Sequence, residues 1–292
     1  KTFASVMLGG LMRRGTAIGP DSRIYAMLER QGPFANPHPD KAAITLTHLM
    51  THSSGLACND NDEESPGNED RMQSQTAQGD WWRYTLDLPR AHPPGTRYAY
   101  CSGNMNLVGA ALTQASGTWL PELFDQLVAE PLQFRGWHWN LMPTGEGYLG
   151  GGAYVLPRDL IKLGQTFLDG GVWNSRRIVD AEWVARSTAQ AIEITPATTG
   201  LDGEAFGNSY GPGGADGLAW HLGTVPAGGR TYRAYNASGN GGQILVVVPE
   251  LELVVVFTAE NYGQGWIWGR WGDELVGGMI VPAIRGRAAG TD

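Results

Sequence analysis

Hydrophobic residues at the start of the chain recur at helical spacing. In a helix of 3.6 residues per turn, the apolar positions of residues 1–14 gather mainly on one side. These positions are Phe3, Val6, Met7, Leu11 and Met12. Gly15 follows them, and glycine commonly ends a helix because it adopts left-handed backbone angles at no steric cost. The pattern predicts a buried helix over residues 1–14.

Helical patterns also fill the middle of the chain, and most of them end at a glycine or a proline. They predict helices over residues 43–50, 104–116, 120–129, 158–168 and 180–189. Residues 59–79 differ because they are acidic and polar and contain Pro66 and Gly67, which predicts a surface loop. We expect the slightly longer segment 59–82 to lie over a substrate cleft.

The pattern changes to short β-rich runs from Gly217 onward. Turns rich in glycine, proline and asparagine separate predicted strands at residues 218–225, 231–237, 244–248 and 253–258, and a final apolar stretch at 266–281 predicts a helix on that sheet. This order predicts an α+β fold, an antiparallel sheet flanked by helices with an inserted, mostly helical domain. We assign residues 1–20 and 205–292 to the sheet domain and 21–204 to the helical one.

The composition of the chain argues against two kinds of partner, nucleic acids and a membrane that the chain would span. The net charge of −8 and a total of three lysines argue against nucleic acid binding, which needs clustered cations. No apolar run approaches the length of a membrane span. The two cysteines, Cys58 and Cys101, are either free thiols or one disulfide, so they leave the compartment open. A periplasmic or secreted location is slightly favoured over the cytoplasm.

Three stretches carry a resemblance to a known family. Residues 44–56 (ITLTHLMTHSSGL), 94–109 (PGTRYAYCSGNMNLVG) and 239–249 (GNGGQILVVVP), the last followed by VVVFT at 254–258, stand in the order of the family's signature blocks. The chain resembles the serine β-lactamase-like and penicillin-binding-protein-like hydrolases, a group that includes class C β-lactamases and family VIII carboxylesterases. The resemblance runs from Lys1 to about residue 281.

The resemblance implies a set of catalytic residues. Lys1 matches the lysine of the family's Ser-x-x-Lys, so the nucleophilic serine and the first strands of the sheet are expected upstream, on a companion N-terminal segment or chain. A serine hydroxyl needs a neighbouring base, and Lys1 with Tyr100 would move its proton. Ala237, Ser238 and Gly239 fall where the family places Lys-Thr-Gly or His-x-Gly. Asn240 would then donate its backbone N–H to the oxyanion.

Two positions depart from the family pattern. Ser102 stands where an asparagine usually follows the catalytic tyrosine, and Ala237 stands where the third block begins with a cation. In penicillin-recognising members, the asparagine helps to hold the acylamino group of the substrate, and the cation helps to hold its carboxylate. We therefore predict an acyl-enzyme hydrolase of a small ester or amide, with carboxylesterase-like activity favoured. The alternatives are a β-lactamase, a D-amino-acid peptidase or amide hydrolase of the same family, and a non-catalytic ligand-binding relative.

No cofactor or metal site is predicted. His48 and His52 have the spacing of a helical zinc pair, but Leu49 replaces the glutamate of that motif and no third ligand is evident, so packing roles are favoured. The acidic run at residues 60–64 lacks the glycine turn of a calcium loop, because Ser65 and Pro66 follow it.

Overall fold

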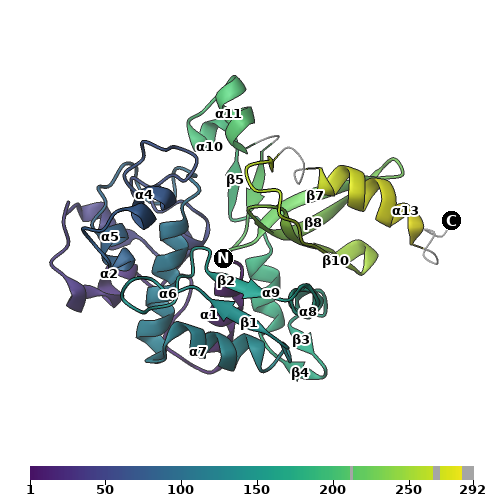
Figure 1. The fold of residues 1–292 in the computed structure, drawn as a ribbon, viewed down its shortest axis with the longest axis horizontal. Coiled ribbons are helices and arrows are strands. Elements are labelled where there is room, and N and C mark those ends of the chain that lie inside the picture. Colours follow the sequence, from purple (N-terminus) through teal and green to yellow (C-terminus); the bar gives the residue numbers. More distant parts are fainter. Residues whose placement is uncertain (211–212, 266–269, 285–292) are drawn as a thin grey trace.

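The start of the chain lies at the centre of the molecule, where a helical part meets a six-stranded sheet (Figure 1). The computed structural model describes residues 1–210, 213–265 and 270–284. Helix α1 (Phe3–Arg13) is buried over nine consecutive residues, Phe3 to Leu11. Since a helix that is apolar all round is stable only inside a core, this burial fixes the position of Lys1 just before its first turn.

The helical part surrounds α1 with short elements. It comprises α2 (Ile24–Met27), 3-10 turns at Glu29–Gln31 and Pro39–Ala43, α3 (Leu46–Met50), α4 (Glu69–Ser74), α5 (Trp81–Leu86), α6 (Ser102–Ser116), α7 (Leu120–Phe124), a π-helical turn at Asp125–Ala129, and the hairpin of β1 (Trp137–Trp139) and β2 (Ala153–Val155). None of the helices in the described ranges is long and apolar enough to cross a bilayer.

Further elements connect this part to the sheet and complete it. They are α8 (Pro157–Leu168), the hairpin of β3 (Val172–Trp173) and β4 (Arg176–Arg177), α9 (Ala181–Ser187), β5 (Ile192–Ile194), α10 (Pro196–Thr199), α11 (Gly203–Tyr210), β6 (Gly214–Asp216), β7 (His221–Ala227), β8 (Arg230–Gly239), β9 (Gln243–Val248), a 3-10 turn at Pro249–Leu251 and β10 (Leu253–Phe257). The strand order is β10-β9-β8-β7-β6-β5, with antiparallel neighbours throughout.

Strand β9 shows how the sheet joins the two layers of helices. Ile244, Val246 and Val248 face a cluster that includes Val276 of the π-helical segment Trp271–Ile280. Leu245 and Val247 belong to the main core, on the side where α8 packs. Because successive side chains point to opposite faces, a strand buried on both faces reads as the continuous apolar run seen here. A last helical turn, α13 (Val281–Ala283), follows the π-helical segment.

The structure confirms the predicted α+β class and most of the long elements. The predicted helix at 266–281 is described from residue 270 onward, and residues 266–269 lie outside the described ranges. The prediction of a loop throughout 59–79 is wrong at α4, where the Asn68 side chain accepts the N–H groups of Asp70 and Arg71 and Met72 is buried. The domain boundaries at residues 20 and 205 stay predictions.

Candidate active site

Lys1 and Tyr100 come together at the start of α1. The Lys1 Nζ lies 5.0 Å from the centre of the Tyr100 ring. Burial lowers the pKa of Lys1, but Tyr100, Glu69 and Asp60 act in the opposite direction and together raise that pKa above its ordinary value. Lys1 therefore keeps its proton at neutral pH and presents a positive charge to the phenol ring.

The segment that carries Tyr100 is fixed on both sides of the tyrosine. The Asp60 N–H donates to the Tyr100 carbonyl oxygen at 2.7 Å. Cys101 forms a disulfide with Cys58, with a Cα–Cα distance of 5.5 Å, which settles the pairing that the sequence left open. Cys101 also caps the N-terminus of α6, so the tyrosine stands immediately before a buried helix. These contacts hold Tyr100 against Lys1.

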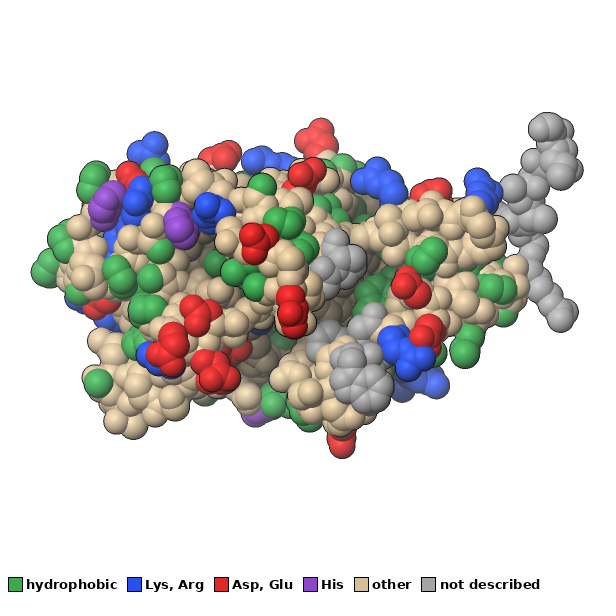
Figure 2. Space-filling view, turned by 90° about the horizontal axis from the view of Figure 1, so that it is seen from above, with side chains coloured by type: hydrophobic (Ala, Val, Ile, Leu, Met, Phe, Trp, Pro, Cys, Tyr) green, Lys and Arg blue, Asp and Glu red, His purple; other side chains and the backbone are tan. Residues whose placement is uncertain are grey.

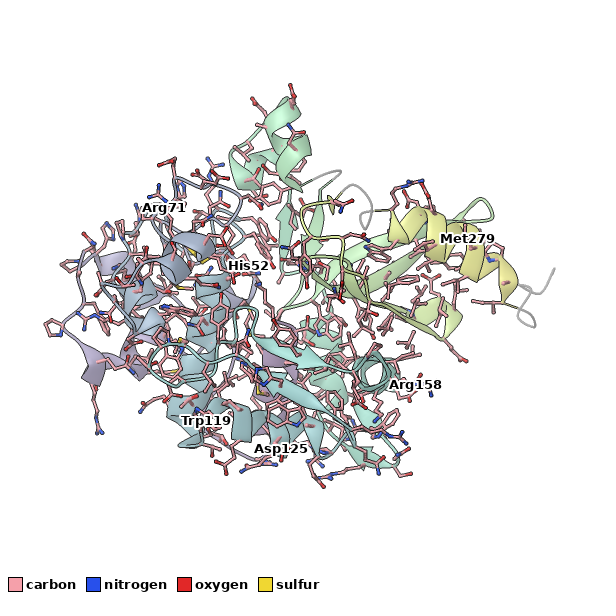
Figure 3. The ribbon with its side chains drawn as sticks, viewed as in Figure 1. His52, Arg71, Trp119, Asp125, Arg158 and Met279 are labelled. Carbon is pink, nitrogen blue, oxygen red and sulfur yellow. A yellow bond between two sulfur atoms is a disulfide. The ribbon has the colours of Figure 1, made fainter. Side chains whose placement is uncertain are left out.

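His52 lies next to Tyr100, and Figure 3 shows it where the helical part meets the sheet. Its ring centroid is 4.6 Å from that of Tyr100, and its Nδ1 accepts the Cys101 N–H at 3.1 Å. Burial lowers the pKa of His52 to about 3, so the ring is neutral. The nearby Gly55 has φ of 75°, and a Cβ there would lie 2.0 Å from the His92 carbonyl oxygen, which explains the glycine in residues 44–56.

His48 does not share a site with His52. Its Nδ1 accepts the Thr45 N–H at 3.2 Å, and the Thr45 hydroxyl accepts the His48 N–H, so that the two residues form a capping box at the start of α3. The described part of the chain contains no group of three or more side chains with metal-ligand chemistry. His48 thus serves the local structure of α3.

Two carboxylates stand beside the lysine and the tyrosine. Asp60 accepts the Ser102 N–H at 2.6 Å and the Glu69 N–H at 2.9 Å, and Glu69 accepts a hydrogen bond from the Tyr148 hydroxyl. Burial raises the pKa of Asp60, and the neighbouring Glu69 charge raises it further. Figure 2 shows acidic side chains gathered on the face above the helical part. Negative charge therefore lies close to Lys1 and to the backbone of Ser102.

A pocket of about 90 Å³ opens at the start of α1. Lys1, His52, Ala237 and Ser238 contribute to its lining, so the structure brings the predicted lysine and part of the third block to one place. Gly239 ends β8 and Asn240 lies exposed in the turn to β9, and neither lines this pocket. Ser102 is fully buried, and its Oγ has no hydrogen-bond partner among the described residues.

The same pocket contains a pair that the sequence analysis missed. His221 Nδ1 lies 2.7 Å from one Asp216 carboxylate oxygen, and the Tyr98 hydroxyl donates to the other at 3.0 Å. Asp216 is buried. Burial lowers the pKa of His221, but the charge of Asp216 and its hydrogen bond together raise that pKa above the ordinary value. Tyr98 stays protonated because burial and Asp216 raise its pKa.

A tight connection between strands creates this pair. Asp216 ends β6, His221 begins β7, and the two are direct cross-strand partners. The turn between them is anchored from outside, since the Leu218 N–H donates to the Ser187 oxygen and the Ala219 N–H to the Met50 oxygen. The strand predicted at residues 218–225 begins inside this turn, so the sequence analysis did not separate β6 from β7 and did not predict the pairing of Asp216 with His221. A turn signal at Gly217 was the one available clue.

Comparison with known proteins identifies the family. A family model described as Beta-lactamase matches residues 1–272. The chain belongs to the beta-lactamase family. Among curated relatives, the D-alanyl-D-alanine-carboxypeptidase/endopeptidase AmpH of Escherichia coli (strain K12) is 25% identical over 275 residues, which cover 86% of this chain and 66% of AmpH. The chain thus spans just under two thirds of that relative.

Two solved structures show the same fold. A family VIII carboxylesterase superposes with a TM-score of 0.64 at 16% identity, over 88% of this chain and 74% of its own. A D-stereospecific amidohydrolase from Streptomyces sp. gives a TM-score of 0.66 at 17% identity, over 93% of this chain and 84% of its own. The family and these neighbours are hydrolases of the serine beta-lactamase type.

Proposed function

We propose that this chain forms the greater part of a serine hydrolase that acts on an ester or amide through an acyl-enzyme. The observation that carries the proposal is the placement of the Lys1 ammonium over the Tyr100 ring. Lys1 also lines a pocket with Ala237 and Ser238, whereas Tyr100 is not one of its lining residues. The nucleophile would be a serine three residues before Lys1, on an N-terminal companion segment. One helical turn brings such a hydroxyl to the lysine side chain.

The positive charge of Lys1 supports a division of the proton-transfer roles between Lys1 and Tyr100. Since the pKa of Lys1 is raised, the ammonium stabilises negative charge that develops on the Tyr100 oxygen. The deprotonated Tyr100 oxygen that this charge supports then takes the serine proton and passes it to the leaving group. The Asn240 backbone N–H and that of the serine would hold the oxyanion. A binding protein has no need of this lysine and tyrosine pair, which supports an enzyme over a non-catalytic relative.

The surroundings of the site favour a substrate without a carboxylate next to the scissile bond. Ala237 provides no cation, and Asp60 and Glu69 bring negative charge close to Lys1. Desolvated like charges repel strongly, so a substrate carboxylate would bind poorly against these residues. This supports carboxylesterase-like activity. The similarity to AmpH supports a D-amino-acid peptidase as the second candidate.

The experiment is to label the full-length protein with a fluorophosphonate and to map the adduct by peptide mass spectrometry. We expect one modified serine, three residues before Lys1, together with faster turnover of short acyl esters than of cephalosporins or D-alanyl-D-alanine peptides. Faster turnover of either of the last two classes would overturn the esterase assignment. A protein that is folded yet unlabelled and inactive on all three would support the binding-protein alternative.

A further inference from the structure

Two histidines line the pocket beside Lys1, and their hydrogen bonds give them different chemistry. His52 accepts the Cys101 N–H at Nδ1, and its pKa of about 3 keeps it neutral. A neutral imidazole carries one proton, which in His52 must therefore be on Nε2. His52 can donate a hydrogen bond from Nε2 but has no free lone pair with which to remove a proton.

His221 has the opposite arrangement. Its Nδ1 faces the Asp216 carboxylate at 2.7 Å, so the proton of the neutral ring is on Nδ1 and the lone pair is on Nε2. Among the described residues, the His221 ring forms its hydrogen bond through Nδ1 alone. The His221 side chain is 30% exposed, which lets water reach the ring. His221 lines the pocket beside Lys1, and an imidazole that a buried carboxylate orients through Nδ1 can act as a general base through Nε2.

The position of His221 connects it to the reacting groups. His221 pairs with Asn236 across β7 and β8, so Ser238, two residues further, points to the same face of the sheet. The pocket that these residues share with Lys1 has room for water, whose share of liquid volume is about 30 Å³. Lys1 itself is charged and offers no lone pair, and Tyr100, the proposed base for the serine, does not line this pocket.

We propose that His221 is a further catalytic residue, the base that activates water for hydrolysis of the acyl-enzyme. The inference rests on the proposed function. His221 Nε2 takes a proton from water while the water oxygen bonds to the acyl carbonyl carbon. The tetrahedral intermediate then collapses, the bond from serine Oγ to carbon breaks, and the proton returns from Nε2 to Oγ. Asp216 and Tyr98 act as positioning residues that hold the imidazole.

The charged groups around His221 set the pH dependence. Asp216 faces it from β6, Tyr100 from the segment before α6, His52 from the turn after α3, and Lys1 from the start of α1; the Tyr98 hydroxyl donates to Asp216 from behind. Asp216 outweighs burial and raises the pKa of His221, while Lys1 acts against it. The deacylation rate should therefore rise with pH through a pKa above 6.5, where the ring loses its second proton.

The test separates acylation from deacylation in the full-length protein, with a p-nitrophenyl ester in a stopped-flow burst assay. We expect His221→Gln to be acylated at nearly the wild-type rate but to turn over about 100-fold more slowly, with a burst close to one equivalent of p-nitrophenol. Intact mass should show the acyl adduct accumulating. His138→Gln, at the exposed middle position of β1, is the matched control and should show wild-type deacylation.

A second variant guards against misfolding. His221→Ala should accumulate the same acyl-enzyme, and added imidazole should restore deacylation in proportion to its concentration. Two results would overturn the role of His221. One is deacylation of the His221→Gln acyl-enzyme at the wild-type rate, and the other is a deacylation rate of His221→Ala that added imidazole does not change. Failure of the wild-type protein to acylate would instead overturn the proposed function, because that step does not use His221.

Discussion

Tyr100 is the residue whose hydroxyl most directly tests proton transfer beside Lys1. We expect Tyr100→Phe to lower kcat for a short acyl ester by about 100-fold to 10,000-fold, the usual contribution of a positioned acid or base. The ring would still lie under the Lys1 ammonium, 5.0 Å away in the native protein, so the packing should survive. Steady-state kinetics and a thermal melt on the full-length protein measure the two effects separately.

Tyr154→Phe is the control for that substitution. Tyr154 lies on β2 and is 58% exposed, and removal of its hydroxyl should leave both kcat and the melting temperature unchanged. If Tyr100→Phe kept wild-type kcat, Tyr100 would have no part in proton transfer, and Lys1 would have to act without it.

The residues of the site differ in how far the sequence could reveal them. Lys1 and Tyr100 were predicted because the family's chemistry requires them in fixed local motifs. Asp216 and His221 were not, because neither stands in a motif and their partnership exists only across two strands. The predicted surface loop at residues 59–79 includes Asp60, yet the Asp60 carboxylate accepts the Ser102 N–H inside the site. Sequence patterns identify residues that stand in local motifs, whereas contacts between distant segments can be identified only once the fold is known.

At the scale of elements, the turn between β6 and β7 is the most sensitive connection in the site. A Cβ on Gly217 would lie 2.2 Å from the Ser187 carbonyl oxygen, far inside contact distance. Because that oxygen belongs to the backbone, the turn must shift, and we expect Gly217→Ala to destabilise the protein by about 1 to 3 kcal/mol. Urea denaturation followed by tryptophan fluorescence measures the loss.

Gly223, in the middle of β7, is the matched position for this change. A Cβ there would meet nothing within 4 Å, so Gly223→Ala should be within about 0.5 kcal/mol of wild type. Equal stability of the two alanine variants would show that the β6–β7 turn tolerates movement, and the close approach to Ser187 would then have no energetic consequence.

Elements were predictable in proportion to their length and periodicity. Helix α6 and strand β9 have long apolar patterns that match their period, and both were predicted close to their observed bounds. Strand β5 and helix α10 have three and four residues, too few for any period to show. Helix α4 was hidden by the acidic residues around it, although Asn68 is a standard N-cap.

At the scale of the whole molecule, the site exists because four distant segments meet at the start of α1. Residues 44–56, 58–69, 98–102 and 216–238 all contribute groups near Lys1; the helical part supplies the first three segments and the sheet supplies the fourth. The pocket and its buried groups are therefore formed only in the folded state. The stability of the protein should depend on pH through the groups that are buried on assembly.

His52 gives this dependence a definite sign. Its folded-state pKa is about 3, against 6.5 in an ordinary histidine, because burial penalises the charged ring. Between these values the unfolded chain binds a proton that the folded chain does not, so the free energy of unfolding falls as the pH falls, by up to about 1.4 kcal/mol per pH unit. His221 contributes in the opposite direction, since its raised pKa favours the folded state as the pH falls.

The variant His52→Gln isolates the first contribution. Its amide oxygen can accept the Cys101 N–H that His52 Nδ1 accepts at 3.1 Å, but it cannot titrate. We therefore expect urea denaturation between pH 6.5 and pH 4.5 to show a smaller loss of stability in His52→Gln than in wild type, with the two converging as the pH falls. His138→Gln should keep the wild-type slope, because His138 is exposed. Parallel slopes for His52→Gln and wild type would mean that His52 is protonated in the folded protein, and the tautomer assigned to it beside Tyr100 would be wrong.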